Sequence, residues 1–336
     1  MKRIKNVKRS LATVLIVSLA LLAALLTACN EPDSIDMDVD FDSESNIVLG
    51  FSQLGDESEW RTASTNDIKR AALAAQVQLL FENAQQQQFN QIKAIRSFIL
   101  KGVDVIAFCP IVEEGWDNVL EEARAANIPV IVVDREINTE SDRLYTAFIG
   151  SDFHREGVMA GLWMVERFED VEGPIRIAEI SGTPESSPAI GRYEGLREVL
   201  KENPKFEIVI SITGDFMRSK GREKMEIILQ ETPDIDILFA HNDDMALGAI
   251  EIMEEHGIIP GMDIIIVSVD AQASGLEALR EGKINCLIEC SPYVGADLME
   301  LVYKIVYGLP FEELTFTETR VFTDLDDFDT LPVRTR

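Results

Sequence analysis

From Ile47 onward the sequence alternates short apolar runs with longer helical stretches, and this alternation limits the folds open to the chain. Each run has the length of a buried strand and is followed by a polar loop and a helix. Strands separated by helices are typical of parallel sheets covered on both faces. The expected strands are 47–52, 77–81, 104–109, 129–133 and 147–150, followed by 175–180, 206–212, 237–240, 264–269 and 284–289.

The pattern restarts after residue 150, so two strand–helix arrays of similar size follow one another. The expected helices are about 60–77, 89–100, 114–126, 153–169, 189–201, 219–230, 244–256, 274–281 and 293–307. We therefore predict an α/β protein with two lobes, each built on a doubly wound parallel sheet. Residues 315–322 alternate like an edge strand, and the tail 324–336 is expected to be loosely attached.

The first 29 residues have the layout of a secretory leader. Basic residues precede an apolar run from Leu11 to Leu26, and Leu26-Thr27-Ala28-Cys29 follows. This last segment resembles the bacterial lipobox, in which the cysteine becomes the lipidated first residue. The alternative is an uncleaved membrane helix, but the run is short for a span. We predict a lipoprotein signal peptide at 1–28, lipidation at Cys29 and an acidic tether at 29–46.

Charge and cysteine usage narrow the possible partners. The net charge is −28, so nucleic acid and anionic lipid surfaces are poor partners for the mature chain. The three histidines are scattered and no CxxC motif occurs. Cys109, Cys286 and Cys290 lie in strand-like segments and are predicted to be buried and unpaired. We expect no metal, no cofactor and no nucleic acid.

Polar residues cluster directly after the predicted strands. These clusters are Ser52 to Arg61, Asp134-Arg135, Glu185 to Arg192, Asp215-Phe216, Asn242-Asp243-Asp244, Asp270 and Glu289. The carboxyl ends of parallel strands meet at one edge of a sheet, where ligands bind. Trp60 offers a flat apolar face, and carboxylates and guanidinium groups offer planar hydrogen bonding, a combination that suits a sugar. Taken singly, Asp243 could be a helix cap and Trp60 a core residue.

Several windows carry a more specific resemblance. They include GFSQLGDESEWR (50–61), NQIKAIRSFILKGVDVIAFCP (90–110), IPVIVVDR (128–135), GDFMRSKGREKME (214–226), FAHNDDMALGAI (239–250) and IIIVSVDA (264–271). In these windows the chain resembles periplasmic sugar-binding proteins of the ribose/galactose-binding superfamily, which serve ABC transporters. Within that superfamily it is most similar to galactofuranose-binding members. The resemblance spans nearly all of 47–322.

The resemblance implies two lobes joined by a hinge of three crossings, near 150, 271 and 291. The first lobe would comprise 47–150 and 272–291, and the second would comprise 151–271 and 292–323. A sugar would bind in the cleft between them.

The resemblance also implies which residues bind the sugar. In the first lobe they are Glu57, Ser58, Glu59, Trp60, Arg61, Asp134 and Arg135; in the second they are Arg192, Asn242 and Asp270. Trp60 would border the sugar face, the arginines would donate to its oxygens, and Asp134, Asn242 and Asp270 would accept from its hydroxyls. Glu59 is a departure, because the family usually has glycine at this position.

The function implied is capture of a monosaccharide outside the cytoplasmic membrane by a lipid-anchored monomer that closes by hinge motion and docks on ABC permease subunits. One alternative is an extracytoplasmic sugar sensor for a chemoreceptor or histidine kinase. A transcriptional repressor would need a basic helix-turn-helix, which is not seen in this sequence. A glycosidase would need a carboxylate pair, but no spacing here supports one. Galactose, arabinose and ribose, as furanose or pyranose, are all compatible with the sequence.

Overall fold

The computed structural model describes residues 47–140 and 144–334. The predicted signal peptide, the lipidation site at Cys29 and the acidic tether at 29–46 lie outside the described residues. The described chain alternates strands and helices in the order expected from the sequence. Two separate six-stranded sheets result, one for each predicted lobe.

The first sheet is parallel throughout and has the order β11-β5-β4-β3-β1-β2. Its strands are β1 (Val48–Gln53), β2 (Gln78–Asn83), β3 (Val105–Phe108), β4 (Val130–Asp134), β5 (Ala147–Gly150) and β11 (Leu314–Phe316). The order places β1 in the interior of the sheet, beside β3. The loop that follows β1 is therefore set between the ends of neighbouring strands.

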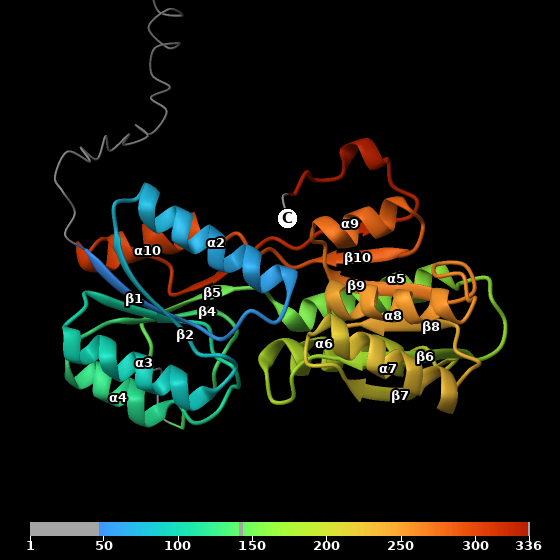
Figure 1. Ribbon diagram of the computed structural model, residues 1–336, viewed down its shortest axis with the longest axis horizontal. Coiled ribbons are helices and arrows are strands. Elements are labelled where there is room, and N and C mark those ends of the chain that lie inside the picture. Colours follow the sequence, from blue (N-terminus) through green and yellow to red (C-terminus); the bar gives the residue numbers. More distant parts are fainter. Residues whose placement is uncertain (1–46, 141–143, 335–336) are drawn as a thin grey trace, which may run out of the picture. The chain divides into compact units, whose positions relative to one another are not determined.

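Helices cover both faces of the first sheet (Figure 1). One face packs against α2 (Glu59–Ala74) and α10 (Gly295–Val306), and the other against α3 (Gln88–Lys101) and α4 (Asp117–Ala125). Strand side chains alternate between these two cores: Val105 and Ala107 face α2 and α10, whereas Ile106 and Phe108 face α3 and α4. Because both faces are buried, the strands are continuous apolar runs in the sequence.

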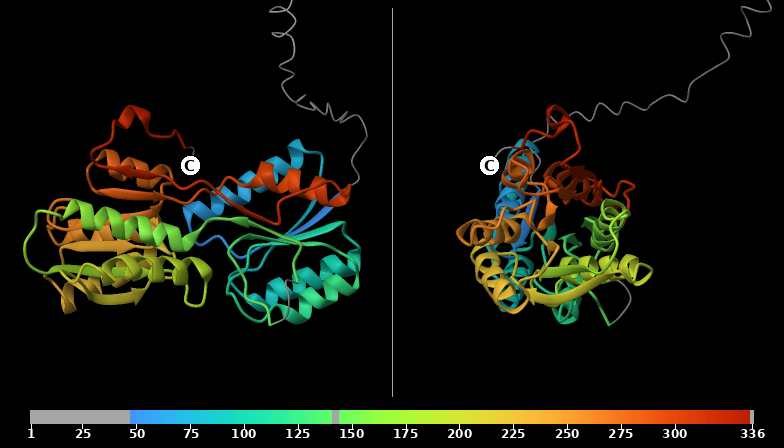
Figure 2. Two further views of the ribbon diagram at one scale, coloured as in Figure 1. Left: turned by 180° about the vertical axis from the view of Figure 1, so that it is seen from behind. Right: turned by 90° about the vertical axis from the view of Figure 1, so that its right-hand side faces the viewer.

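The second sheet has the order β12-β10-β9-β8-β6-β7 and is parallel except for β12, which runs antiparallel to β10. Its strands are β6 (Ile175–Ser181), β7 (Phe206–Thr213), β8 (Ile237–Ala240), β9 (Ile265–Asp270), β10 (Cys286–Glu289) and β12 (Val321–Thr323). One face packs against α5 (Phe153–Arg167) and α6 (Ser187–Lys201), the other against α7 (Arg218–Glu231), α8 (Asp243–Glu255) and α9 (Ala273–Arg280) (Figures 1 and 2). The predicted α/β two-lobed fold class is confirmed.

The chain crosses between the two sheets at three places, two of which lie close to the expected positions 150 and 291. It leaves the first sheet after Gly150, returns between Glu289 and Gly295, and leaves again between Phe316 and Val321. The expected crossing near 271 is therefore wrong, and a crossing at 317–320 takes its place. The single edge strand predicted at 315–322 is in fact β11 and β12, which belong to different sheets.

The lobe assignment of residues 272–323 is corrected accordingly. Strand β10 pairs in parallel with β9, with Cys286 opposite Val267, so most of 272–291 belongs to the second lobe. Helix α10 packs in the core of the first sheet, so the following segment begins in the first lobe. An apolar run predicts a strand, but it does not predict which of two neighbouring sheets the strand joins.

The C-terminal tail is docked on the second lobe, contrary to the expectation that it is loosely attached. Leu331 is buried in the core formed with α7, α8 and α9, and Phe328 packs against the same core. The guanidinium of Arg334 forms an ion pair with Glu289 at the end of β10, which Arg320 also contacts at 2.6 Å. The tail thus binds a strand that leads directly into the hinge.

We predict that Leu331→Ala lowers the free energy of unfolding by about 2 kcal/mol, because it leaves a cavity in an apolar core. Leu325 is the matched control in the same tail: it is 79% exposed, whereas Leu331 is 6% exposed. Leu325→Ala should change stability by less than about 0.5 kcal/mol. Urea unfolding of both variants measures the difference. Equal effects would contradict docking of the tail.

Candidate functional site

A cavity lies where the carboxyl ends of strands from the two lobes face each other. The space between its walls that no atom occupies is about 300 Å³, including the part open to solvent. The residues lining it are Glu57, Ser58, Trp60, Arg61, Asp134, Arg135, Phe153, Pro188, Arg192, Phe216, Asn242, Asp270 and Cys290. They come from both lobes and from the crossing after β10.

The start of α2 positions Trp60 and Arg61. Ser58 is the N-cap of this helix, and its Oγ accepts a hydrogen bond from the backbone N–H of Arg61 at 3.1 Å. The indole Nε1 of Trp60 donates to the carbonyl oxygen of Cys290 at 2.7 Å. Trp60 is 6% exposed and packs against Phe153 of α5. Trp60 therefore packs in the core and lines the cavity at the same time. The two roles considered from the sequence, a core residue and a residue that borders the sugar, are compatible.

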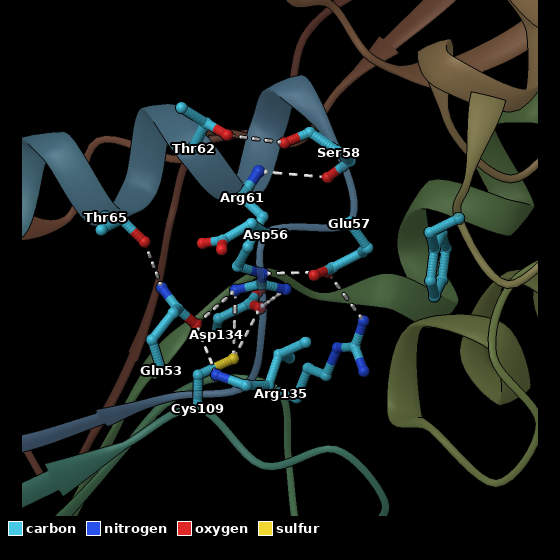
Figure 3. A network of polar contacts seen from close by, with 12 residues as sticks. Gln53, Asp56, Glu57, Ser58, Arg61, Thr62, Thr65, Cys109, Asp134 and Arg135 are labelled. Carbon is cyan, nitrogen blue, oxygen red and sulfur yellow. Dashed lines mark hydrogen bonds and ion pairs between the residues drawn. The ribbon is translucent and has the colours of Figure 1, made fainter. Parts of the chain in front are cut away.

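Arg61 is at the centre of a buried polar network in the first lobe (Figure 3). Its Nη2 lies 2.9 Å from Asp134 Oδ2, and its Nε donates to Glu57 Oε1 at 3.1 Å. Cys109 Sγ accepts from Arg61 Nη1 and donates to Asp134 Oδ2, both at 3.1 Å. Burial raises the pKa of the Cys109 thiol, so it remains protonated and able to donate. The network fixes the carboxylate of Asp134 at the end of β4.

Arg135 is held by fewer contacts than Arg61, and part of its guanidinium has no hydrogen-bond partner in the described chain. Its Nη1 donates to the carbonyl oxygen of Ile111 at 3.1 Å, and its Nη2 lies 3.8 Å from Glu57 Oε1. Within the described residues, Arg135 Nε and Glu57 Oε2 are buried and have no hydrogen-bond partner. Burial and the nearby Arg61 lower the pKa of Arg135. A ligand that both donates and accepts hydrogen bonds would satisfy these two atoms.

Arg192 of α6 enters the cavity from the second lobe. Its Nε donates to Glu156 Oε2 of α5 at 2.8 Å, and its Nη1 donates to the carbonyl oxygen of His241. Burial disfavours the charged guanidinium, but Glu156 and the other acidic groups nearby together offset this and raise the pKa of Arg192. The guanidinium also lies over the ring of Phe153, with Cζ 5.4 Å from the ring centroid. Arg192 is thus a fixed donor opposite the first-lobe network.

Asn242 and Asp270 complete the second-lobe side. Asn242 is the N-cap of α8: its Oδ1 accepts from the backbone N–H of Met245 at 3.0 Å, and its Nδ2 donates to the carbonyl oxygen of Phe216 at 3.1 Å. Asp270 ends β9 with a φ of 117°, an unfavourable backbone angle for a residue with a side chain. Burial and the nearby Asp243 raise the pKa of Asp270. Such strain and charge burial are typical of functional sites.

The structure brings together every expected site residue except Glu59. The Glu59 carboxylate accepts a hydrogen bond from Ser274 of the second lobe, outside the cavity. The reason is local: at the first position of α2, Glu59 lies next to Ser58 and Trp60 but points away from them. The expectation that Glu59 contacts the ligand has no support in this placement.

Four lining residues were not expected: Phe153, Pro188, Phe216 and Cys290. The polar clusters after the strands pointed to the loops that carry Pro188 and Phe216, but not to an apolar role for those side chains. No local signal marked Phe153 or Cys290, because only the crossing of the chain between the sheets brings them here. As predicted, Cys109, Cys286 and Cys290 are buried and free.

Two further features concern metals and membranes. Among residues 47–140 and 144–334, no cluster of three or more His, Cys, Asp or Glu side chains is arranged to hold a metal ion. Over the same ranges, no helix combines the length and the apolar character needed to cross a bilayer.

Comparison with known proteins identifies the family. Residues 49–310 match the family model described as periplasmic binding protein domain. The chain belongs to the periplasmic binding protein family. Its members are solute-binding proteins, and the relatives with known structures share the two-lobed fold.

Individual members of the periplasmic binding protein family are similar over most of their length. The galactofuranose-binding protein YtfQ of Escherichia coli is 39% identical, over 82% of this chain and 87% of YtfQ. A Mycobacterium smegmatis protein in complex with β-D-fucofuranose is 48% identical with a TM-score of 0.82, over 83% of this chain and 91% of that chain. The binding component of an arabinose ABC transporter from Shewanella sp. ANA-3 was solved bound to α- and β-L-arabinofuranose. It is 42% identical with a TM-score of 0.79, over 82% of this chain and 92% of that chain.

Glu179 is buried beneath the second-lobe site, and its ionisation makes the stability of the protein depend on pH. Burial raises the pKa of this carboxyl, but hydrogen bonds from His241, Arg197 and Ser211 outweigh burial and lower its pKa to about 2. A carboxyl whose pKa is depressed on folding stabilises the protein above the unfolded pKa and loses this contribution as pH falls through the folded pKa.

We therefore predict that the stability contributed by Glu179, on the order of 3 kcal/mol, is lost between about pH 4.5 and pH 2. Glu179→Gln should be less stable than the wild type at pH 6 and should show a flatter fall toward pH 2.5. Glu207→Gln, which alters an exposed carboxyl on β7, should leave the profile unchanged. Urea unfolding across this range measures the slopes, and identical slopes in Glu179→Gln and wild type would contradict the assignment.

Proposed function

We propose that this protein is the substrate-binding component of an ABC sugar importer, which binds a monosaccharide in the cavity between its lobes and delivers it to the permease. One observation carries the proposal: the cavity combines the indole of Trp60 with three buried arginines and three buried carboxylates. An aromatic face and planar charged groups match the two surfaces of a sugar ring, its C–H face and its rim of hydroxyls.

The charges of the cavity favour a neutral ligand. The cations are Arg61, Arg135 and Arg192, and the anions are Glu57, Asp134 and Asp270. The three arginines are matched in number by these carboxyl groups, but the raised pKa of Asp270 favours its neutral form, and Arg192 is paired with Glu156 behind the cavity. An added charge on a buried ligand would need a partner of its own. Hydroxyl groups donate to carboxylates and accept from guanidinium groups, so a polyhydroxylated neutral ligand can satisfy both kinds of group.

The names of the relatives support a sugar of galactofuranose or galactose type. YtfQ is named for galactofuranose, and two related structures hold fucofuranose and arabinofuranose. We propose a five-membered-ring sugar as the first ligand to test. We also propose, from the leader and lipobox, that the protein is a lipoprotein anchored through Cys29 outside the cytoplasmic membrane, and that it acts as a monomer.

Thermal unfolding of the protein from residue 30 onward, in the presence of a panel of simple sugars, tests the proposed function. A ligand that binds only the folded state raises the midpoint by an amount that grows with its concentration over Kd. A shift with a furanose or with galactose, and none with a hexuronate, is the expected result. A flat response to all sugars would overturn the proposal. Loss of sugar uptake on deletion of the gene separates transport from sensing.

We predict that Trp60→Ala and Arg135→Ala each weaken sugar binding at least tenfold, about 1.4 kcal/mol or more. The first removes the aromatic wall, and the second removes the buried donor Nε that has no partner in the described chain. Arg155→Ala is a control, because Arg155 is exposed on α5. Isothermal titration calorimetry gives the affinities, with circular dichroism to confirm folding. Unchanged affinity in both folded variants would contradict the site.

We predict that Cys29→Ser releases the protein from membranes, because serine cannot form the thioether that carries the lipid. Fractionation of cells that express the full chain measures this. The wild type should sediment with membranes and the variant should be soluble. Retention of Cys29→Ser with membranes would contradict lipidation at this position.

A further inference from the structure

At the rim of the cleft, the start of α2 in the first lobe contacts two helix starts in the second lobe. The backbone N–H of Glu59 donates to Oδ2 of Asp244 at 2.6 Å. The carboxylate of Glu59 accepts from the hydroxyl of Ser274. Asp244 lies in the first turn of α8, and Ser274 lies in the first turn of α9. Two hydrogen bonds therefore join the lobes directly at this rim.

The arrangement is reciprocal, since each lobe presents a carboxylate to the first turn of a helix in the other. The first N–H groups of a helix have no partner within it, and the positive end of the helix dipole favours an anion there. Asp244 satisfies such a group on α2, because Glu59 is the first residue of that helix. Glu59 lies correspondingly at the start of α9. These contacts form only when the two helix starts are close, so opening of the lobes at this rim would break them.

The rim contact is separate from the ligand cavity. Glu59, Asp244 and Ser274 are not among the residues that line it. The lobes also touch where Glu113 N–H donates to the carbonyl oxygen of Glu185 and Glu136 N–H donates to Ser187 Oγ. Those contacts involve other loops, those that follow β3, β4 and β6.

The carboxylates at this rim also oppose one another. Burial raises the pKa of Asp244, the hydrogen bond from Glu59 N–H lowers it, and the charge of Glu59 raises it again. Asp243, next to Asp244, is buried and adds a third carboxyl, while Arg218 offers a compensating positive charge. This repulsion offsets part of the stabilisation that the two hydrogen bonds contribute. The net stabilisation from this contact is therefore modest, and single substitutions can remove it.

We propose that Glu59, Asp244 and Ser274 form an inter-lobe latch that stabilises the closed protein and lengthens the residence time of the ligand without touching it. Glu59 is thus a positioning residue that acts through lobe closure. The inference rests on the proposed function for its effect on ligand release, but the latch itself can be measured without any ligand.

Two substitutions at position 59 separate the two hydrogen bonds. Glu59→Ala removes the carboxylate only. Glu59→Pro also removes the N–H, at the first position of a helix, where proline is well tolerated. The preceding residue, Ser58, has φ −146° and ψ 163°, an extended conformation compatible with a following proline. Asp244→Ala and Ser274→Ala remove the partners. Asp56→Ala is the control, since Asp56 is exposed in the same loop and bonds to Asn83 of its own lobe.

Sugar affinity and dissociation rate test the latch once a ligand has been found. Each latch variant should bind about threefold to tenfold more weakly, through faster dissociation. The loss should be the same factor for two different sugars, because no ligand contact changes. Glu59→Pro removes both bonds, so adding Asp244→Ala to it should cause no further loss; Ser274→Ala and Asp244→Ala remove different bonds and should add. Unchanged affinity, or a changed ratio between sugars, would overturn the proposal.

Small-angle X-ray scattering without ligand keeps this test independent of the proposed function. If the latch stabilises closure, Glu59→Pro and Asp244→Ala should have a larger radius of gyration than the wild type and the Asp56→Ala control. Equal radii together with equal amide hydrogen exchange at the start of α2 would overturn the latch. Failure of every sugar to bind the wild type would overturn the proposed function and leave these two measurements valid.

Discussion

The ion pair between Arg61 and Asp134 is the interaction on which the first-lobe site depends. Both side chains are buried, and charges out of water must be paired and hydrogen-bonded to be tolerated. Glu57, Cys109 and Gln53 supply further contacts, so the guanidinium is held from several directions. Arg61 is therefore largely committed to the structure. Arg135, by contrast, keeps a buried donor without a partner in the described chain, and is better placed to bind a ligand directly.

The second lobe also holds a buried arginine in place with a buried carboxylate. Glu156 of α5 holds Arg192 of α6, and the carbonyl oxygen of His241 accepts its second hydrogen bond. Close packing of the two helices makes this possible: a side chain at Gly157 or Gly195 would clash with the backbone of the neighbouring helix. Each lobe thus presents a fixed arginine to the cavity. A ligand between them would bridge two rigid surfaces whose relative position is set by three chain crossings and by contacts at the rim.

The hinge is more constrained than its short length suggests. Glu289, at the end of β10, forms ion pairs with Arg320 in the third crossing and with Arg334 in the tail. Two of the three crossings and the C-terminal tail are therefore linked through a single carboxylate. On the cavity side, Trp60 donates to the carbonyl oxygen of Cys290 in the same crossing. The hinge, the tail and the site are parts of one connected network.

The sequence by itself determined the two-lobed α/β architecture, because short apolar strands between helices and polar clusters after the strands are local patterns. It also determined most of the cavity, since carboxyl ends of parallel strands meet wherever such a sheet forms. Only the tertiary structure decided which sheet β10 and β11 join, that Phe153 and Cys290 line the cavity, and that Glu59 reaches Ser274 instead. These outcomes depend on contacts between segments far apart in the chain, and no local pattern of residues encodes which of two similar lobes a segment will meet.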